Sequence, residues 1–283
     1  MLTVVDVLLR TERFLRERGV DTPRLEAELL IGDVLKLSRM QLYLAHDRPL
    51  DLNELEHLRG LVARRGKREP LAYIVGSQPF HAIDLAIVPG VLIPRQDTET
   101  LVEAAIEWFG AATDPLYVAD VGCGSGAVGL ALAHRLPHLR LYATDRSDIA
   151  LQLTRQNRDA LGMAQRVAVL EGDLLNAVPL DRPIDWVVSN PPYIPSSEIP
   201  GLQPEVSQYE PRLALDGGLD GLDVYRRLLP EAAKRARRGC LVEVGQRQAA
   251  QVSDLMRRAG FSSINVWNDL AGIARVVGGR HPV

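Results

Sequence analysis

The stretch Asp120-Val121-Gly122-Cys123-Gly124-Ser125-Gly126 decides the fold. It follows an apolar segment, residues 116–121, and leads into residues 127–135, where apolar side chains recur at helical spacing. Glycines at a strand-to-helix turn let the backbone approach a ligand closely at the carboxyl edge of a parallel sheet. The stretch therefore predicts a ligand-binding loop in an α/β domain.

Strand and helix patterns alternate on both sides of this loop. Further strands are predicted at 140–144, 167–171, 184–189 and 240–244, and a final antiparallel pair at 263–267 and 273–277. Helices are predicted at 98–109, 148–161, 222–237 and 248–259. Such alternation indicates a mostly parallel sheet covered on both faces. We therefore predict a Rossmann-like, seven-stranded, doubly wound α/β domain over residues 97–283.

The first 70 residues contain only helical patterns. Helix starts are indicated by Thr3, by Thr22-Pro23, by Ser38, and by Asp51 with Glu54, which resembles a capping box. Short amphipathic helices with short loops predict a small all-α bundle over residues 1–70. Two clusters of basic side chains are interpreted as solvated helix ends in preference to contact sites for an RNA-rich partner: Arg64, Arg65, Lys67 and Arg68, and Lys234, Arg235, Arg237 and Arg238.

Residues 71–96 have a different pattern. Residues 71–76 and 80–88 alternate apolar and other side chains, with turn residues between the two segments. Pro89-Gly90 and Pro94 close the stretch. We therefore predict a β-hairpin linker, over residues 71–96, between the helical bundle and the α/β domain.

Composition excludes several classes of protein. Of 283 residues 46% are hydrophobic, yet no apolar run is long enough for a membrane span, and the N-terminus lacks a signal-peptide pattern. Cys123 and Cys240 are far apart and the six histidines are scattered, so no metal site is expected. We expect a reduced, cytoplasmic protein without a bound metal.

The charge balance argues against nucleic acid as a partner. There are 33 Lys and Arg against 36 Asp and Glu, a net charge of −3. Proteins that hold duplex DNA through many phosphates carry a clear basic excess. No specific nucleic-acid binding is therefore expected.

Acidic residues at successive strand ends outline a cofactor pocket. Gly122-x-Gly124-x-x-Ala127, with Asp145 about twenty residues on, nearly satisfies the dinucleotide fingerprint, so an NAD enzyme stays open at this point. A third glycine, Gly126, instead indicates a wider loop for a ligand without a pyrophosphate. Asp145 can hold ribose hydroxyls, and Asp173, followed by Leu174, can meet an adenine amino group. Asp120 is placed to meet a cationic amine.

The motif Asn190-Pro191-Pro192-Tyr193 follows the strand predicted at residues 184–189. Its prolines fix φ and restrict the residues before them, so the Asn190 side-chain oxygen and the Pro191 carbonyl are held as two rigid acceptors. A planar NH2 group needs such a pair, because each of its N–H bonds can donate to one oxygen. Tyr193 is expected to give a face that stacks on or shields that group.

These strand ends resemble those of class I S-adenosylmethionine-dependent methyltransferases, and the NPPY motif resembles their amino-methylating branch. Over nearly its whole length the chain is similar to the HemK/PrmC family, the release-factor glutamine methyltransferases. The likeness includes these further stretches: residues 21–28 (DTPRLEAE), 69–74 (EPLAYI), 92–99 (LIPRQDTE), 209–218 (YEPRLALDGG) and 269–272 (DLAG). Leu174 and Gln96 depart from the family pattern, which often has an aromatic residue and a proline there.

The resemblance implies methyl transfer from S-adenosylmethionine to the side-chain amide nitrogen of the glutamine in the GGQ motif of class I peptide chain release factors. It implies that the helical bundle recognises the release factor. It places the glutamine on residues 190–193, with Asn190, Pro191 and Tyr193 as catalytic residues and Pro192 beside them. The implied cofactor contacts are Asp120, Gly122, Cys123, Gly124, Ser125, Gly126, Asp145, Asp173, Leu174 and Asn190.

The motifs leave other functions open. A ribosomal-protein glutamine methyltransferase differs mainly in the N-terminal domain and in residues 194–220. A DNA or RNA base methyltransferase uses the same acceptor pair but needs a basic groove. A non-enzymatic scaffold is the least favoured, because the glycine loop, Asp145 and the NPPY motif are all intact.

Overall fold

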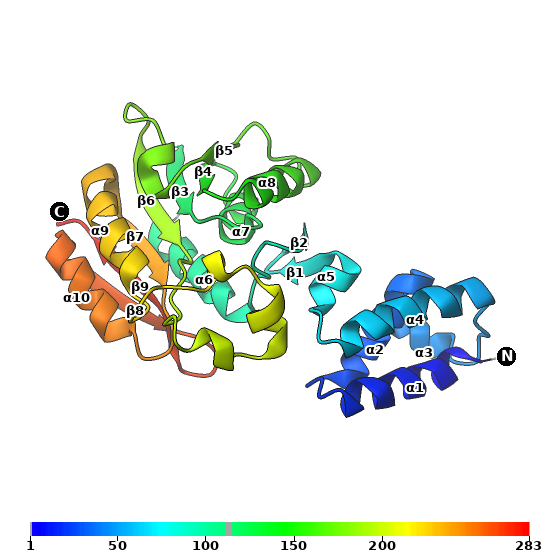
Figure 1. The fold of residues 1–283 in the computed structure, drawn as a ribbon. Coiled ribbons are helices and arrows are strands. Elements are labelled where there is room, and N and C mark those ends of the chain that lie inside the picture. The colour runs from blue at the N-terminus through cyan, green and yellow to red at the C-terminus, as the bar shows by residue number, and fades with distance from the viewer. Residues whose placement is uncertain (1, 111–114, 283) are drawn as a thin grey trace. The chain divides into compact units, whose positions relative to one another are not determined.

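The computed structural model describes residues 2–110 and 115–282, and their contacts form two compact units (Figure 1). The first unit is Met1–Gly76 together with Gln203–Tyr209, and the second is Ser77–Leu202 together with Glu210–Val283. The domain limits inferred from the sequence, 1–70, 71–96 and 97–283, stay predictions. One segment from the middle of the chain thus belongs to the N-terminal unit.

The N-terminal unit is helical, as predicted. Its helices are α1 (Val4–Glu17), α2 (Pro23–Leu35), α3 (Arg39–Leu44), α4 (Leu52–Gly66) and α5 (Leu71–Val75). Capping boxes form at Thr3, Ser38 and Asp51, whereas the Thr22 side chain makes no cap hydrogen bond. Leu15, Leu30 and Ile31 are fully buried in the core between the helices.

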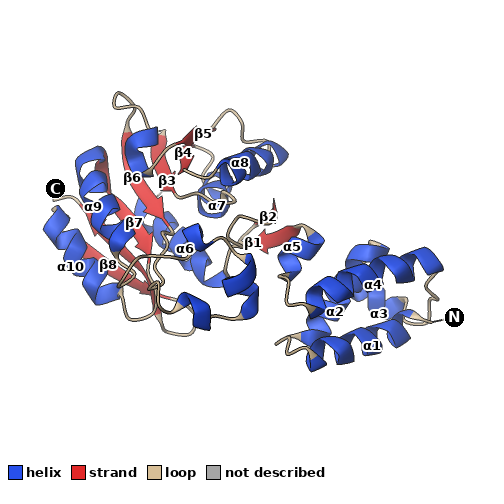
Figure 2. Ribbon diagram, viewed as in Figure 1, coloured by secondary structure: helices blue, strands red, loops and turns tan. Residues whose placement is uncertain are grey.

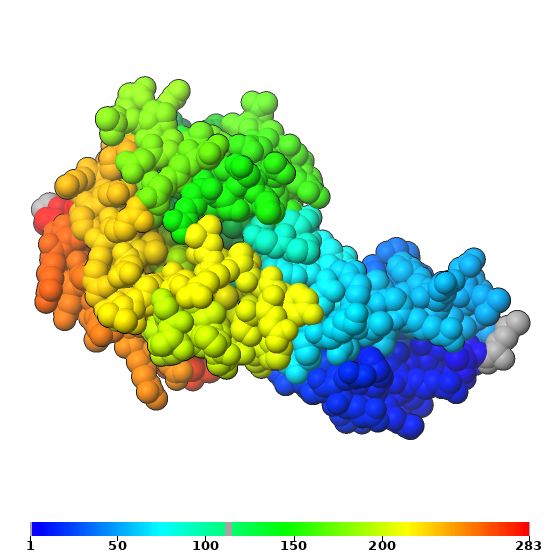
Figure 3. All heavy atoms as spheres, in the orientation of Figure 1, coloured from blue at the N-terminus to red at the C-terminus, as the bar shows by residue number. Residues whose placement is uncertain are grey.

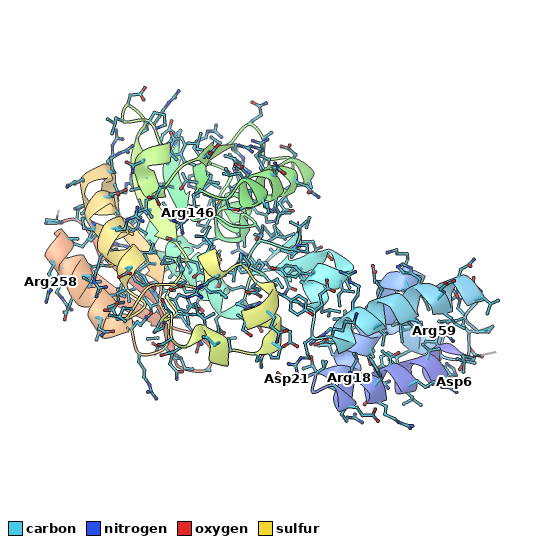
Figure 4. The ribbon with its side chains drawn as sticks, in the orientation of Figure 1. Asp6, Arg18, Asp21, Arg59, Arg146 and Arg258 are labelled. Atoms are coloured by element: carbon cyan, nitrogen blue, oxygen red, sulfur yellow. The ribbon has the colours of Figure 1, made fainter. Side chains whose placement is uncertain are left out.

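Residues Gln203–Tyr209 are bonded to this helical unit by charged and polar side chains. Arg68 makes a bidentate ion pair with Glu205, at 2.6 and 2.7 Å, and Arg65 Nη2 lies 2.8 Å from Glu205 Oε1. The Tyr209 hydroxyl donates to the Lys67 carbonyl, at 2.8 Å. Gln203 donates to Asp21, which Figure 4 labels. The interpretation of residues 64–68 as a solvated helix end is wrong for Arg65, which is buried and paired with two glutamates, whereas Lys67 is exposed.

The predicted hairpin is present but shorter than expected. Its strands are β1 (Ser77–Phe80) and β2 (Ile83–Ala86), which pair antiparallel. The prediction of a strand at residues 71–76 is wrong, because Leu71–Val75 form α5. Pro70 precedes this single turn, and Gly76 ends it with φ at 78°, a left-handed conformation that glycine adopts readily. Residues 71–75 are apolar without interruption, and so short an apolar run fits either a helical turn or a strand.

The seven-stranded sheet is confirmed within the described residues, in the order β5-β4-β3-β6-β7-β9-β8 (Figure 2). The strands are β3 (Leu116–Val121), β4 (Leu139–Asp145), β5 (Val167–Glu171), β6 (Ile184–Ser189), β7 (Ala236–Glu243), β8 (Ser263–Asn268) and β9 (Ala274–Arg280). β3 to β7 are parallel, and β9 pairs antiparallel with both β7 and β8. The carboxyl ends of the central strands therefore share one edge, which is where ligands bind in such folds.

Helices cover both faces of this sheet. They are α6 (Glu99–Phe109), α7 (Ala127–Arg135), α8 (Asp148–Ala160), α9 (Asp223–Arg235) and α10 (Ala249–Ala259). Ala119 and Val121 of β3 share a core with α9 and α10, which lie side by side in Figure 1. Asp120, between them, bonds to Gly129 of α7. Successive residues of a strand point to opposite faces, so α7 lies on the other face from α9 and α10.

Within the part of the chain that the structure describes, no helix is both long and apolar enough to span a membrane.

Candidate active site

A cavity lies at the carboxyl edge of the sheet, within the second unit. Most of the residues predicted for the cofactor and the substrate line it: Asp120, Gly122, Cys123, Gly124, Ser125, Asp145, Asp173, Leu174, Asn190, Pro191 and Pro192. These residues come from the ends of β3, β4, β5 and β6, so the fold brings together four separate stretches of sequence. Gly126 and Tyr193 are not among the lining residues that the structure describes.

The glycine loop requires its glycines. Gly122, Gly124 and Gly126 all have positive φ, at 71°, 57° and 83°, where other residues are strained. A Cβ atom at Gly126 would also lie 2.8 Å from Leu130. The N–H groups of Gly122 and Cys123 both donate to the Thr144 carbonyl at the end of β4. The loop is therefore held in a single shape between two strand ends.

Asp120 is a buried carboxylate in the wall of this cavity. It is 2% exposed, and its Oδ2 accepts the N–H of Gly129 at 2.9 Å. Burial raises the pKa of Asp120 to about 7, and the nearby charge of Asp145 adds to the increase. A carboxylate held in this way favours a cationic group of a ligand as its partner.

Asp145 and Asp173 stand at the ends of β4 and β5 and have different partners. Asp145 Oδ1 accepts the Ser147 N–H at 2.9 Å, and Oδ2 accepts the Gly124 N–H at 3.0 Å. Asp173 instead forms an ion pair with Arg227. Arg146, labelled in Figure 4, also lines the cavity beside Asp145. The expected contact of Asp173 with an adenine amino group would therefore compete with Arg227.

Leu174 has an unusual backbone conformation. It is buried with φ at 54°, and its carbonyl accepts the Thr144 hydroxyl at 3.2 Å. Non-glycine residues in this region are strained and are concentrated at functional sites. Leu174 lines the cavity at the position where the resemblance implies an aromatic residue.

The NPPY turn directly follows β6. The Ser189 hydroxyl donates to the Val121 carbonyl at 2.7 Å, which fixes the strand end. The Asn190 side-chain nitrogen donates to the Thr98 hydroxyl at 3.3 Å. This bond uses one of the two N–H groups, and the amide oxygen can accept a hydrogen bond from a ligand in the cavity.

The Tyr193 side chain bonds to another residue of the protein, whereas the sequence predicted that it would stack on the substrate. Its hydroxyl donates to Glu243 Oε1 at 3.3 Å, and burial raises the pKa of Tyr193. Gln248 holds the Tyr193 carbonyl at 2.9 Å. The structure thus gives Tyr193 a role in holding the turn, and its stacking on a substrate stays a prediction.

Several residues of the site were not predicted from the sequence. Thr98 and Glu243 are buried beside the NPPY turn, and Pro211, Leu213 and Ala214 line the cavity from the long segment after it. In the space-filling view, yellow atoms of this segment, near residues 210–220, are exposed on the face shown (Figure 3). The sequence contains one signal: Glu243 is a charged residue within the otherwise apolar stretch 240–244, and buried charges need partners.

The arrangement combines an acid-lined pocket with Asn190 and Pro191 in its wall. Across residues 2–110 and 115–282, no group of His, Cys, Asp or Glu side chains is arranged to hold a metal ion. The chemistry that the described side chains support is the placing of an NH2 group next to a bound cation.

Comparison with known proteins gives matches for both parts of the chain. Residues 6–76 match a family model described as the PrmC N-terminal domain, and residues 106–200 match one described as the methyltransferase small domain.

Curated relatives match almost the full length. A release factor glutamine methyltransferase of Geobacter sulfurreducens is 45% identical over 280 residues, which cover 98% of this chain and 96% of the relative. One from Moorella thermoacetica is 44% identical over 275 residues, 96% of each chain. Among solved structures, the N-terminal domain of human METTL16 has a TM-score of 0.52 at 15% identity, covering 70% of this chain and 76% of that one. The last likeness concerns the fold alone.

Proposed function

The chain belongs to the release factor glutamine methyltransferase family, and from this we propose that it methylates the side-chain amide nitrogen of a glutamine in a class I peptide chain release factor. The methyl donor in this proposal is S-adenosylmethionine, and the target is the glutamine of the GGQ motif. We expect the enzyme to act in the cytoplasm, where release factors terminate translation.

The observation that carries the proposal is the geometry of Asn190 and Pro191. Both line the cavity, and the Asn190 nitrogen is already bonded to Thr98, which leaves its oxygen for a ligand. A carboxamide NH2 would donate one N–H to Asn190 Oδ1 and the other to the Pro191 carbonyl. The NH2 group of an amide can satisfy both acceptors at once.

The cavity also fits the proposed methyl donor. S-adenosylmethionine carries an ammonium group and a sulfonium, and it supplies an activated methyl group when bound. Asp120 is buried with a raised pKa, so it gains from a cationic partner in the cavity. Asp145 has acceptor oxygens for ribose hydroxyls, and the positive-φ glycines leave room for a ligand against the backbone.

The contribution of the protein to the reaction is positioning and charge. An amide nitrogen is a weak nucleophile because its lone pair is delocalised into the carbonyl. Asn190 and Pro191 orient this nitrogen toward the methyl group, which reduces the entropic part of the barrier. Their hydrogen bonds strengthen as positive charge develops on the nitrogen, so they stabilise the transition state more than the ground state. The proton then leaves after the methyl group has transferred, and the proposal needs no protein base.

The test is incubation of the purified protein with methyl-labelled S-adenosylmethionine and a purified release factor, followed by peptide mapping. We expect label on the glutamine of the GGQ peptide and none on a factor in which that glutamine is replaced by alanine. Parallel reactions contain ribosomal proteins, DNA and RNA. Preferred labelling of any of these would show that the substrate is a ribosomal protein or a nucleic acid and not the release factor.

A further inference from the structure

We propose that Arg227 belongs to the adenine-binding part of the cavity, where its planar guanidinium group packs against the base of S-adenosylmethionine. The inference rests on the proposed function and deepens it, because it assigns a further residue to the binding of the same cofactor. Arg227 lies on helix α9 and is outside all the strand-end motifs that the sequence indicated.

The order of the strands gives the direction of the cofactor along the cavity. Neighbouring strands at the carboxyl edge are β6, β3, β4 and β5, in that order. In the proposed function the methyl group lies beside Asn190, after β6, and the ribose lies at Asp145, after β4. The sulfur and the base are attached to opposite ends of the ribose, so the base continues toward Asp173, after β5. The residues that follow β5 therefore border the adenine end of the cavity.

Helix α9 lies along the turn that follows β5. Arg227, Glu231 and Arg235 are spaced by four residues and so share one face of the helix. Arg227 forms an ion pair with Asp173. Glu231 Oε2 accepts the Leu175 N–H at 3.4 Å, and Arg235 Nη1 donates to the Leu175 carbonyl at 3.3 Å. These bonds fix the position of α9, and with it that of Arg227, beside the end of β5.

Arg227 also lines the cavity. Val224, three residues earlier on the same face of α9, lines it as well. Asp173 and Leu174 line it from the end of β5. Val224 packs against the core cluster that contains Leu174. Side chains of α9 and of the β5 end therefore border the same part of the cavity.

The chemistry of these side chains suits a purine base. Leu174 and Val224 are aliphatic, so they offer apolar surface without a ring. The guanidinium group of an arginine is planar and stacks on aromatic rings and nucleobases. Its positive charge is attracted to the electron-rich face of such a ring. Arg227 thus supplies a planar cationic surface at the adenine end of the cavity.

The ion pair with Asp173 prepares Arg227 for this contact. The Arg227 side chain is 50% exposed, and an ion pair that is open to water adds little to the stability of a fold. The pair does restrict the side chain, so less conformational freedom is lost when a ligand binds. Arg227 competes with an adenine amino group for Asp173 Oδ2 alone, since Oδ1 has lone pairs of its own. The two residues can therefore bind one base together, Arg227 at its face and Asp173 at its edge.

The first experiment measures the binding of S-adenosylhomocysteine, which has the same base and no methyl group to transfer, by titration calorimetry without release factor. Arg227→Ala should weaken binding by about 5- to 30-fold. Arg227→Lys keeps the charge but not the planar group, so its affinity should still fall by at least about 3-fold. Wild-type affinity in either variant would overturn the proposal.

Arg226→Ala is the matched control. Arg226 is the preceding residue on α9, its side chain is 45% exposed, and it pairs with Asp220 and Asp223. It is not among the described residues that line the cavity. Arg226→Ala should change the affinity by less than about 2-fold. Equal losses in Arg226→Ala and Arg227→Ala would contradict the inference. Circular dichroism checks that every variant keeps the wild-type fold.

Adenosine shows which end of the cofactor Arg227 contacts. An arginine is also a suitable partner for the carboxylate of the cofactor. Adenosine contains the base and the ribose but no carboxylate, and its affinity is measured by displacement of S-adenosylhomocysteine. We expect Arg227→Ala to weaken the binding of both ligands by the same factor. Unchanged affinity for adenosine would place Arg227 at the carboxylate and overturn the inference.

The binding data also separate the inference from the proposed function. If the wild-type protein does not bind S-adenosylhomocysteine, the proposed function fails. If wild type and Arg227→Ala bind it equally well, only the role of Arg227 fails.

Discussion

Asp145 Oδ2 accepts the backbone N–H of Gly124 at 3.0 Å, so the end of β4 is bonded to the glycine loop that follows β3. Asp145 Oδ1 is bonded to the Ser147 N–H on the other side. Asp145, which is expected to hold the ribose hydroxyls, therefore also helps to hold the glycine loop in its shape. Changing it should affect both the hydroxyl contacts and the shape of the loop.

Asp145→Ala should weaken S-adenosylmethionine binding by about 10- to 100-fold, through loss of charge-assisted hydrogen bonds worth about 1.5–3 kcal/mol. Asp145→Asn keeps an oxygen for the Gly124 N–H but lacks the charge, so its affinity should be intermediate. Titration calorimetry measures both. Unchanged affinity in Asp145→Ala, with circular dichroism matching wild type, would exclude Asp145 from the site.

Affinity for S-adenosylmethionine should depend on pH through Asp120. Its pKa is raised to about 7 by burial, and only the ionised form attracts the ammonium group. Affinity should therefore fall as the pH decreases through 7, by up to about 10-fold per pH unit. Asp120→Asn should bind weakly, with no such dependence between pH 6 and 8.

Thermal unfolding supplies a check on Asp120 without the cofactor. The pKa of Asp120 is higher in the folded protein than the value of about 4 in the unfolded chain, so the fold loses stability as the pH rises from about 4 through about 7, and the loss is complete near pH 8. Asp120→Asn should consequently raise the Tm at pH 8, by about 2–4 °C for each kcal/mol regained. A lower Tm at that pH would contradict the raised pKa.

Asn190→Ala should reduce single-turnover methylation of release factor by about 100- to 1,000-fold, equivalent to about 2.7–4 kcal/mol, because one transition-state acceptor is lost. Cofactor affinity should change less. Asn190→Asp keeps an oxygen toward the substrate and should retain more activity than alanine, although it cannot donate to Thr98. Near-wild-type turnover in Asn190→Ala with an intact fold would refute the role of this residue.

Gly221→Ala should disturb the NPPY turn. A Cβ atom there would lie 2.2 Å from the Tyr193 carbonyl oxygen and 2.5 Å from Gln248 Nε2. Gly162→Ala is the matched control, since its φ of 68° is similar to the 76° of Gly221 but nothing lies within 4 Å. Both should lose about 1–2 kcal/mol of stability to the left-handed conformation. Only Gly221→Ala should also lower turnover, by about 10- to 100-fold. Equal turnover in the two variants would contradict the close contact.

Much of the fold could be predicted because its signals are local. Strands β3, β5 and β6 have the predicted limits, and the caps at Thr3, Ser38 and Asp51 were visible as residue types at fixed spacing. Residues 71–75 were not predictable in this way, because a single turn carries too few residues to reveal a period. Their structure depends on Pro70 and Gly76 at its two ends.

The part of the site that was missed depends on neighbours across the sheet. The glycine loop, Asp145 and Asn190 each follow a strand in the sequence, and parallel strands bring such ends together. Glu243 lies beside Asn190 because strand β7 is next to strand β6 in the sheet. The sequence pattern does not specify this order of the strands. The same holds for Thr98, which comes from the start of α6, and for the Tyr193 hydroxyl, which bonds to Glu243.

Residues Gln203–Tyr209 have a practical consequence for work with shortened proteins. Glu205 bonds to Arg65 and Arg68, and Tyr209 bonds to the Lys67 carbonyl. All three partners are removed if the chain is shortened to residues 77–283. Glu205 would become a carboxylate without its arginines, a few residues before Pro211 in the cavity wall. A truncated enzyme could thus lose activity through this segment as well as through the loss of the helices expected to recognise the substrate. Exchanging Glu205 for glutamine in the full-length protein separates these two causes.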